Sequence, residues 1–150
     1  MSKLKIYLDI CSYNRPFDDQ SQKKILLETE AKLFIQSAIK ENKYLLVWSY
    51  MLDFENSNNP YEDRKKSVAQ WKDVSHEYCP SSNEILSLGR EIMKFGVKEF
   101  DALHIACAII CGCGYFITTD RRLLNRPITK IKLINPVDFI FEMEDISNEN

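Results

Sequence analysis

The sequence lacks long apolar runs. None of its apolar segments approaches the roughly 20 residues that a membrane-spanning helix requires, although 45% of its 150 residues are hydrophobic. The apolar run near the start, in MSKLKIYLD, is too short for the core of a signal peptide and leads directly into a plausible strand. We therefore expect a cytoplasmic protein that does not associate with membranes.

Cysteines are few and follow no disulfide framework, because there are five of them without regular spacing. This usage fits a reducing compartment, where cysteine acts as a small buried apolar residue. Close pairs of zinc-ligand cysteines are also missing. His104, Cys107 and Cys111 nevertheless share one helical face, with Cys113 just beyond. Zinc binding at this face is the weaker alternative to simple helix packing.

Neither sign of charge dominates, and no linker divides the chain. The formal net charge of −2 gives no bulk attraction to nucleic acid. A polyanionic substrate would therefore need bound cations and local basic patches. We find no internal repeat, no low-complexity tract and no Gly/Ser-rich segment, and a chain of this length can bury about two thirds of its unfolded surface. We expect one domain over residues 1–150.

Apolar segments alternate with helical patterns along the chain. The predicted strands are residues 6–8, 44–49, 115–120 and 130–135. The predicted helices are residues 21–40, a segment after Asn59, residues 81–96, a segment from Asp101 to Gly112 or Gly114, and a short one from Pro136. Strands separated by helices predict a parallel sheet covered on both faces. The expected fold class is α/β, with a three-layer α/β/α sandwich.

Helix boundaries follow from capping patterns. Asn59 is predicted to cap a helix that has Pro60 at its first position. Ser81 is predicted to cap the following helix, and Gly96 to supply the left-handed residue that ends it.

Acidic residues fall where this fold would bring them together. Asp9 ends the first strand and Asp120 ends the third, so both belong to the carboxyl rim of the sheet. Asp53 and Glu55 follow the second strand, and Asp101 leads an otherwise apolar helix. Each acid alone is explained equally well as a turn, solvated or helix-start residue.

A cluster of four carboxylates in apolar surroundings is repulsive unless protons or cations compensate it. Oxygen ligands favour hard cations, so the cluster predicts Mg²⁺ or Mn²⁺. Such a cation makes a bound water nucleophilic and neutralises charge on a phosphoryl group. The chemistry that fits is hydrolysis of phosphodiester bonds.

Four segments, LDICSYNRPFDD, SYMLDFE, KEFDALHIACA and FITTD, resemble in their order and spacing the motifs of PIN-domain nucleases, the family that includes the VapC toxins. The resemblance covers nearly the whole chain. It implies a sheet of four or five parallel strands, one or two Mg²⁺ or Mn²⁺ ions, and RNA as substrate. It assigns the catalytic and metal-binding acids to Asp9, Glu55, Asp101 and Asp120.

The second acid has a competitor two residues away. Glu55 fits the family spacing from Ser49, whereas Asp53 lies closer to the strand. On a helix the two side chains would point about 200° apart. We therefore expect only one of them to be a ligand, and favour Glu55.

Several other residues are candidates for accessory roles: Ser12, Asp53, His104, Thr119, Arg15 and Arg121. Ser12 and Thr119 occupy places where the family has polar residues, while Cys11 departs from its usual Thr or Ser. His104 follows Asp101 by three residues, so it is either structural or orients that acid.

Basic and aromatic residues near the rim are candidates for RNA contacts. Arg15 and Arg121 flank the motifs and could bind phosphate; Arg122, Arg64, Lys65 and Lys66 are further basic candidates. Tyr13 and Phe17 could stack on bases or simply pack the loop.

Other functions fit less well. A phosphotransferase of the haloacid dehalogenase type needs a second Asp two residues after the first, where this chain has Cys11. A receiver domain would need a Lys after a late strand. The remaining alternative is a catalytically silent PIN-like module that binds protein or RNA.

The long predicted helix suggests the oligomeric state. Its expected core stripe is Leu27, Ala31, Phe34 and Ala38. Ile25, Ile35 and Ile39 then remain as excess apolar surface, which a symmetric dimer would bury. We expect a homodimer, and the resemblance adds an antitoxin protein as a possible partner.

Overall fold

The computed structural model describes residues 3–149, which contain a central sheet of five parallel strands. The strands are β1 (Lys5–Leu8), β2 (Leu45–Ser49), β3 (Glu77–Cys79), β4 (Tyr115–Ile117) and β5 (Lys132–Ile134). They lie in the order β3-β2-β1-β4-β5. The chain builds outward from β1 on one side and then adds β4 and β5 on the other. The order therefore reverses between β1 and β4, where ligands of open α/β sheets bind outside the carboxyl ends.

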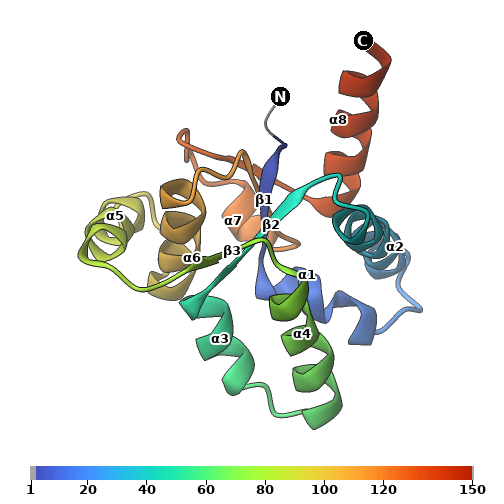
Figure 1. Ribbon diagram of the computed structural model, residues 1–150, viewed down its shortest axis with the longest axis horizontal. Helices are drawn as coiled ribbons and strands as arrows, with labels where there is room; N and C mark the ends of the chain where they lie inside the picture. Colours follow the sequence, from blue (N-terminus) through green and yellow to red (C-terminus); the bar gives the residue numbers. More distant parts are fainter. Residues whose placement is uncertain (1–2, 150) are drawn as a thin grey trace.

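Helices connect the strands. They are α1 (Ile10–Asn14), the 3-10 helix η1 (Arg15–Phe17), α2 (Lys23–Lys40), α3 (Tyr50–Ser57), α4 (Glu62–Val74), α5 (Asn83–Met93), α6 (Glu99–Ile110), α7 (Arg121–Leu124) and α8 (Pro136–Glu149). Figure 1 shows α5 and α6 on one side of the sheet and α2 and α8 on the other. The three-layer α/β/α sandwich predicted from the sequence is confirmed.

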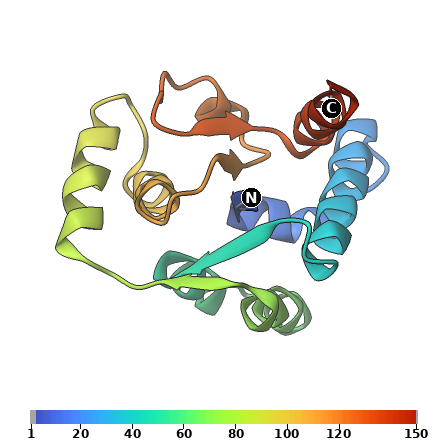
Figure 2. The same cartoon turned by 45° about the horizontal axis from the view of Figure 1, so that its top comes forward.

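Figure 2 shows the same layers from above, with β2 and β3 running side by side. The two strands are parallel to each other, and Val47 of β2 pairs with Glu77 at the start of β3. The short edge strand β3 was not predicted, because its three residues EYC show no apolar run. Among residues 3–149 we find no helix with both the length and the apolarity to cross a membrane.

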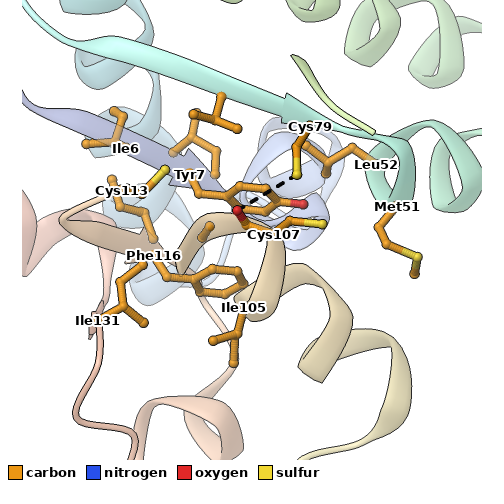
Figure 3. Packing of buried hydrophobic residues seen from close by; sticks show 14 of the residues in the cluster. Ile6, Tyr7, Met51, Leu52, Cys79, Ile105, Cys107, Cys113, Phe116 and Ile131 are labelled. Atoms are coloured by element: carbon orange, nitrogen blue, oxygen red, sulfur yellow. Dashed lines mark hydrogen bonds between the residues drawn. The ribbon is translucent and has the colours of Figure 1, made fainter. Parts of the chain in front are cut away.

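The core lies on both faces of the sheet, against α6 on one side and against α2 and α8 on the other. Tyr7 of β1 stacks on Phe116 of β4, with ring centroids 5.3 Å apart. Figure 3 shows Tyr7 at the centre of this packing, with Cys107 beside it. Cys79 of β3 donates a weak hydrogen bond of 3.9 Å to the carbonyl of Cys107, drawn as a dashed line in Figure 3. The buried cysteines thus fill space between β3 and α6.

Helix α2 is rotated relative to the prediction. Of the expected core stripe, Leu27 and Phe34 are 54% and 64% exposed. Ile35 and Ile39, expected at a dimer interface, are instead buried in the core. The helix turns this way because it also buries Glu28, which pairs with Arg15. An Ile35–Ile39 dimer interface is therefore wrong.

The chain ends helices as predicted but starts some of them later. Gly96 and Gly112 adopt φ values of +84° and +77°, the left-handed conformation that favours glycine. Helix α4 starts at Glu62 and not at Pro60, because the Asn59 side chain accepts a bond from the Tyr61 N–H in a local turn. Ser82, one residue after the predicted cap, caps α5.

Candidate active site

Asp9 lies at the carboxyl end of β1, beside the point where the strand order reverses. It is the N-cap of α1, and its Oδ1 accepts a hydrogen bond of 2.8 Å from the Ile10 N–H. Its Oδ2 accepts a bond of 2.9 Å from the Thr118 hydroxyl. The residue is only 4% exposed. Two neighbouring parallel strands thus fix the orientation of this carboxylate.

Thr118 is a positioning residue that the sequence analysis missed. Its Oγ1 donates to Asp9 and accepts a bond of 3.1 Å from the Asp120 N–H. A single hydroxyl therefore links the first and fourth predicted acids. The signal was available, because Thr118 directly follows β4, where a polar side chain must face the rim. The neighbouring Thr119, the predicted accessory residue, instead offers its N–H to the Cys11 sulfur at 3.5 Å.

Asp120 and Asp101 face one another across a small hollow. Asp120 is the N-cap of α7, where its side chain accepts a bond of 2.9 Å from the Arg122 N–H. Asp101 lies in the first turn of α6. Both line a hollow of about 130 Å³ together with Arg122 and Arg126.

Glu55 is held by a chain of hydrogen bonds that runs into the core. Its Oε1 lies 2.6 Å from His104 Nε2, and His104 Nδ1 lies 2.5 Å from the Tyr7 hydroxyl. That hydroxyl lies 2.6 Å from Ser49 Oγ. A carboxylate oxygen only accepts, so His104 Nε2 donates to Glu55. His104, expected to orient Asp101 if it had a role, positions Glu55 instead.

Asp53 points elsewhere. It accepts hydrogen bonds from the Trp48 indole at 2.8 Å, the Tyr78 hydroxyl at 2.9 Å and the Lys72 ammonium at 3.1 Å. These bonds tie α3 to β2, β3 and α4, and they lower the pKa of Asp53 against the opposing effect of burial. Asp53 thus has its own compensating cation, whereas Glu55 turns toward the core histidine.

The carboxylates influence one another electrostatically. Burial, followed by the charges of Asp9 and Asp120, raises the pKa of Asp101 to about 6. Burial also raises the pKa of Asp9, with Glu55 adding to the rise, while His104 and Thr118 oppose it. The site therefore carries negative charge that its own hydrogen bonds compensate only in part.

The donor set fits a hard cation, because all four groups are carboxylates whose mutual repulsion a cation would relieve. As arranged here, the described residues 3–149 bring no three His, Cys, Asp or Glu side chains into one group that could hold a metal ion. The hydrogen bond of Glu55 to His104 accounts for part of this separation.

Two predicted accessory residues, Ser12 and Arg15, and the stacking candidate Tyr13 serve the structure. The Ser12 hydroxyl donates to the Ile117 carbonyl at 3.2 Å, which ties α1 to β4. Arg15 is occupied by Glu28 and Asp18, at 2.8 and 3.0 Å. Tyr13 is buried, with its ring edge-on to a tryptophan. Arg15 and Tyr13 are therefore not free for RNA, and Ser12 is directed into the fold.

Exposed basic side chains flank the acids. Arg122 and Arg126 line the hollow at Asp101, and no ion pair joins either to a carboxylate within residues 3–149. Gly96 makes room for Arg126, because a Cβ at Gly96 would lie 2.8 Å from its guanidinium. Arg121 is exposed in the first turn of α7.

A second hollow lies on the Glu55 side. It measures about 270 Å³ and is lined by Glu55, Tyr61 and Arg64 among others. The Arg64 guanidinium lies over the Tyr61 ring, 4.3 Å from its centroid. Both sides of the acid cluster thus offer a basic side chain next to a carboxylate.

Comparison with known proteins rests on structure. No protein-family model matches the chain, and a search of curated proteins finds no match. The crystal structure of VapBC2 from Rickettsia felis bound to a DNA fragment from their promoter superposes with a TM-score of 0.57 at 14% identity, over 88% of this chain and 98% of that chain. PAE2754 from Pyrobaculum aerophilum superposes with a TM-score of 0.52 at 15% identity, over 95% and 90%. The chain therefore has the PIN-like fold of VapC proteins, as its four acidic segments predicted.

Proposed function

We propose that this protein is a metal-dependent endoribonuclease that hydrolyses RNA phosphodiester bonds. One observation carries the proposal: Asp9 and Asp120 follow the two strands between which the order reverses, and Asp101 shares a hollow with Asp120. Burial and the charges of neighbouring acids raise the pKa values of Asp9 and Asp101. Perturbed carboxyls of this kind are typical of functional sites. The PIN-like fold supports the same reading.

Mg²⁺ or Mn²⁺ would be held by Asp9, Asp101 and Asp120, with Glu55 as the fourth acid. Such a cation supplies charge neutralisation at the phosphoryl group and lowers the pKa of a bound water. The chain's own residues supply position. Thr118 fixes Asp9 and the backbone of Asp120 relative to each other.

His104 fixes the position of the Glu55 side chain through a hydrogen bond. Both ring nitrogens of His104 are bonded, and its side chain is fully buried. Glu55 reaches the site from α3, while Asp101 and His104 share the first two turns of α6. The Glu55–His104 hydrogen bond therefore links α3 to α6, the two helices that carry the second and third acids.

The partners and the setting are part of the proposal. The matched Rickettsia felis structure contains VapBC2, which supports an antitoxin protein as partner and a toxin as the role. The cytoplasmic location stays a prediction. The homodimer also stays a prediction. We now expect the dimer interface at the exposed apolar side chains of Leu27 and Phe34 on α2 and Phe141 on α8. Light scattering of the purified chain measures the dimer, and co-purification with a neighbouring gene product tests the antitoxin.

The test is a cleavage assay on labelled RNA with Mg²⁺ or Mn²⁺, with and without EDTA. Asp9→Asn and Asp101→Asn should each slow cleavage by at least about 10²–10³-fold, the loss expected when one group that stabilises the transition state is removed. Glu55→Gln should lose activity, whereas the matched variant Asp53→Asn should keep it.

Two results would contradict the proposal. Normal cleavage by Asp9→Asn would remove the assigned site. RNA binding by the wild type without any cleavage in Mg²⁺ or Mn²⁺ would instead favour the alternative, a silent RNA-binding module of the same fold.

A further inference from the structure

Two phenylalanine rings form an exposed pair beside the acids. Phe54 of α3 and Phe100 of α6 meet edge to face, with centroids 5.4 Å apart and ring planes at 80°. They are 46% and 49% exposed. An apolar pair of this size is costly to leave in water, so its position on the surface calls for an explanation.

The pair lies next to the proposed catalytic residues. Phe54 immediately precedes Glu55, and Phe100 immediately precedes Asp101. Successive helix residues point about 100° apart. Glu55 therefore turns inward to His104 while Phe54 turns outward to Phe100. The rings thus flank the two acids that α3 and α6 contribute.

Basic side chains surround this arrangement. Lys98 and Arg122 line the hollow at Asp101 and Asp120, and Arg64 lines the hollow at Glu55. Lys98 and Arg122 are exposed and form no ion pair within residues 3–149. Basic side chains beside an aromatic surface are suited to binding a nucleic acid, because they can contact its phosphates while the rings stack on its bases.

We propose that Phe54 and Phe100 form a stacking platform for an unpaired base of single-stranded RNA, next to the bond that is cut. The inference rests on the proposed nuclease function and adds the residues that would bind the base beside the cleaved bond. Base stacking on aromatic side chains tolerates any base, because every base has a π face. Bases inside a duplex are already stacked, so the platform selects single-stranded segments or loops.

Neighbouring phosphates would then contact the free cations. Lys98 precedes Phe100 by two residues, at the N-cap of α6. The first turn of α6 also directs free backbone N–H groups and the positive end of its dipole toward the same region. A nucleotide stacked on Phe100 therefore places its phosphate near both positive features.

Binding to fluorescein-labelled oligouridylate tests the platform, measured by anisotropy in Ca²⁺ to avoid turnover. The matched ligand is an abasic ribose-phosphate oligomer of the same length. Phe54→Leu and Phe100→Leu keep apolar bulk but remove the π face. Each should weaken oligouridylate binding by roughly 5-fold or more, the lower end of the loss of one stacked base, and leave the abasic oligomer unaffected.

Phe95→Leu is the control, because Phe95 is 49% exposed and lines a separate hollow with Leu88 and Ile109. It should bind both oligomers as the wild type does. Unchanged oligouridylate binding by both platform variants would overturn the inference. If those variants instead change the mass measured by light scattering, with unaltered RNA binding, the pair is a protein contact.

The stacking proposal and the nuclease proposal can be disproved independently of each other. Base-dependent binding without cleavage in Mg²⁺ or Mn²⁺ keeps the platform and ends the nuclease proposal. Cleavage by a wild type that binds the abasic oligomer as tightly as oligouridylate keeps the nuclease and ends the platform.

Discussion

The protein buries carboxylates in two regions, and only one of them comes with its own cation. At the α1–α2 junction, Glu28 is 1% exposed and accepts bonds from Arg15 at 2.8 and 3.0 Å, while its second oxygen accepts from Asn135 at 2.5 Å. At the rim of the sheet, Asp9 has hydroxyl, thiol and backbone donors, and no ion pair within residues 3–149 joins it or Asp101 to a cation.

The difference separates a structural charge from a functional one. A buried ion pair with its remaining lone pairs satisfied needs nothing further from outside the chain. A cluster of carboxylates without a cation stays repulsive until a proton or metal ion arrives. Three predictions test whether the two regions differ in this way.

The largest expected effect is at the compensated region. Glu28→Gln removes the charge that faces Arg15 and should lower the free energy of unfolding by about 3 kcal/mol, because breaking a buried pair leaves a charge without its partner. Urea denaturation measures the loss. Glu30→Gln, on the exposed side of the same helix, should change stability by no more than about 0.5 kcal/mol. Equal effects of the two variants would show that Arg15 and Glu28 are not coupled.

The rim was predictable because it depends on topology. Strand and helix patterns place Asp9 and Asp120 after neighbouring parallel strands and Asp101 at a helix start. In a parallel sheet those positions share an edge whatever the side-chain details. The α/β/α class followed from these patterns, and the PIN-like fold from the resemblance of the four segments. The joint binding of a metal by the acids stays a prediction.

The compensated region was not predictable, because it depends on tertiary pairing. Glu28 lies in a polar stretch of α2, and its sequence context predicts an exposed side chain. In the structure it is buried in an ion pair with Arg15, and Leu27 is exposed. Both faces of α2 are apolar enough to be core, so periodicity could not decide between them. The role of His104 was missed for the same reason, since its partners Glu55 and Tyr7 lie 49 and 97 residues away.

The second prediction addresses the region without a cation. Mg²⁺ or Mn²⁺ should raise the melting temperature in a concentration-dependent way. When the metal concentration is one hundred times its dissociation constant, the free energy of unfolding should increase by about 2.7 kcal/mol. Asp101→Asn should reduce the metal-induced rise in melting temperature. Glu28→Gln should have a lower melting temperature than the wild type but show the same metal-induced rise. Calorimetric scans across a metal titration measure both.

A metal-independent melting temperature would place the acid cluster with the structural charges. Stoichiometric zinc in the purified protein, removed by EDTA only with unfolding, would instead revive the cysteines near His104 as a metal site.

The smallest effect is a pH dependence of stability without metal. The pKa of Asp101 is about 6 in the folded protein, against an ordinary value of 3.8, so between these pH values the folded state keeps a proton that the unfolded state has lost. The stability contributed by this group is therefore present at pH 4 and falls as the pH rises to about 6. Burial raises the pKa of Asp9 in the same direction.

Asp101→Asn removes the titrating group, so in EDTA its melting temperature should match the wild type at pH 4 and exceed it at pH 7. The gain should be about 1 kcal/mol, or 2–4 °C, because partial exposure of Asp101 screens the repulsion. Asp63→Asn is the matched control, since Asp63 also lies in a first helical turn but is exposed; it should show no such rise. A difference between Asp101→Asn and wild type that is the same at both pH values would mean that repulsion among the acids does not set the stability of the rim.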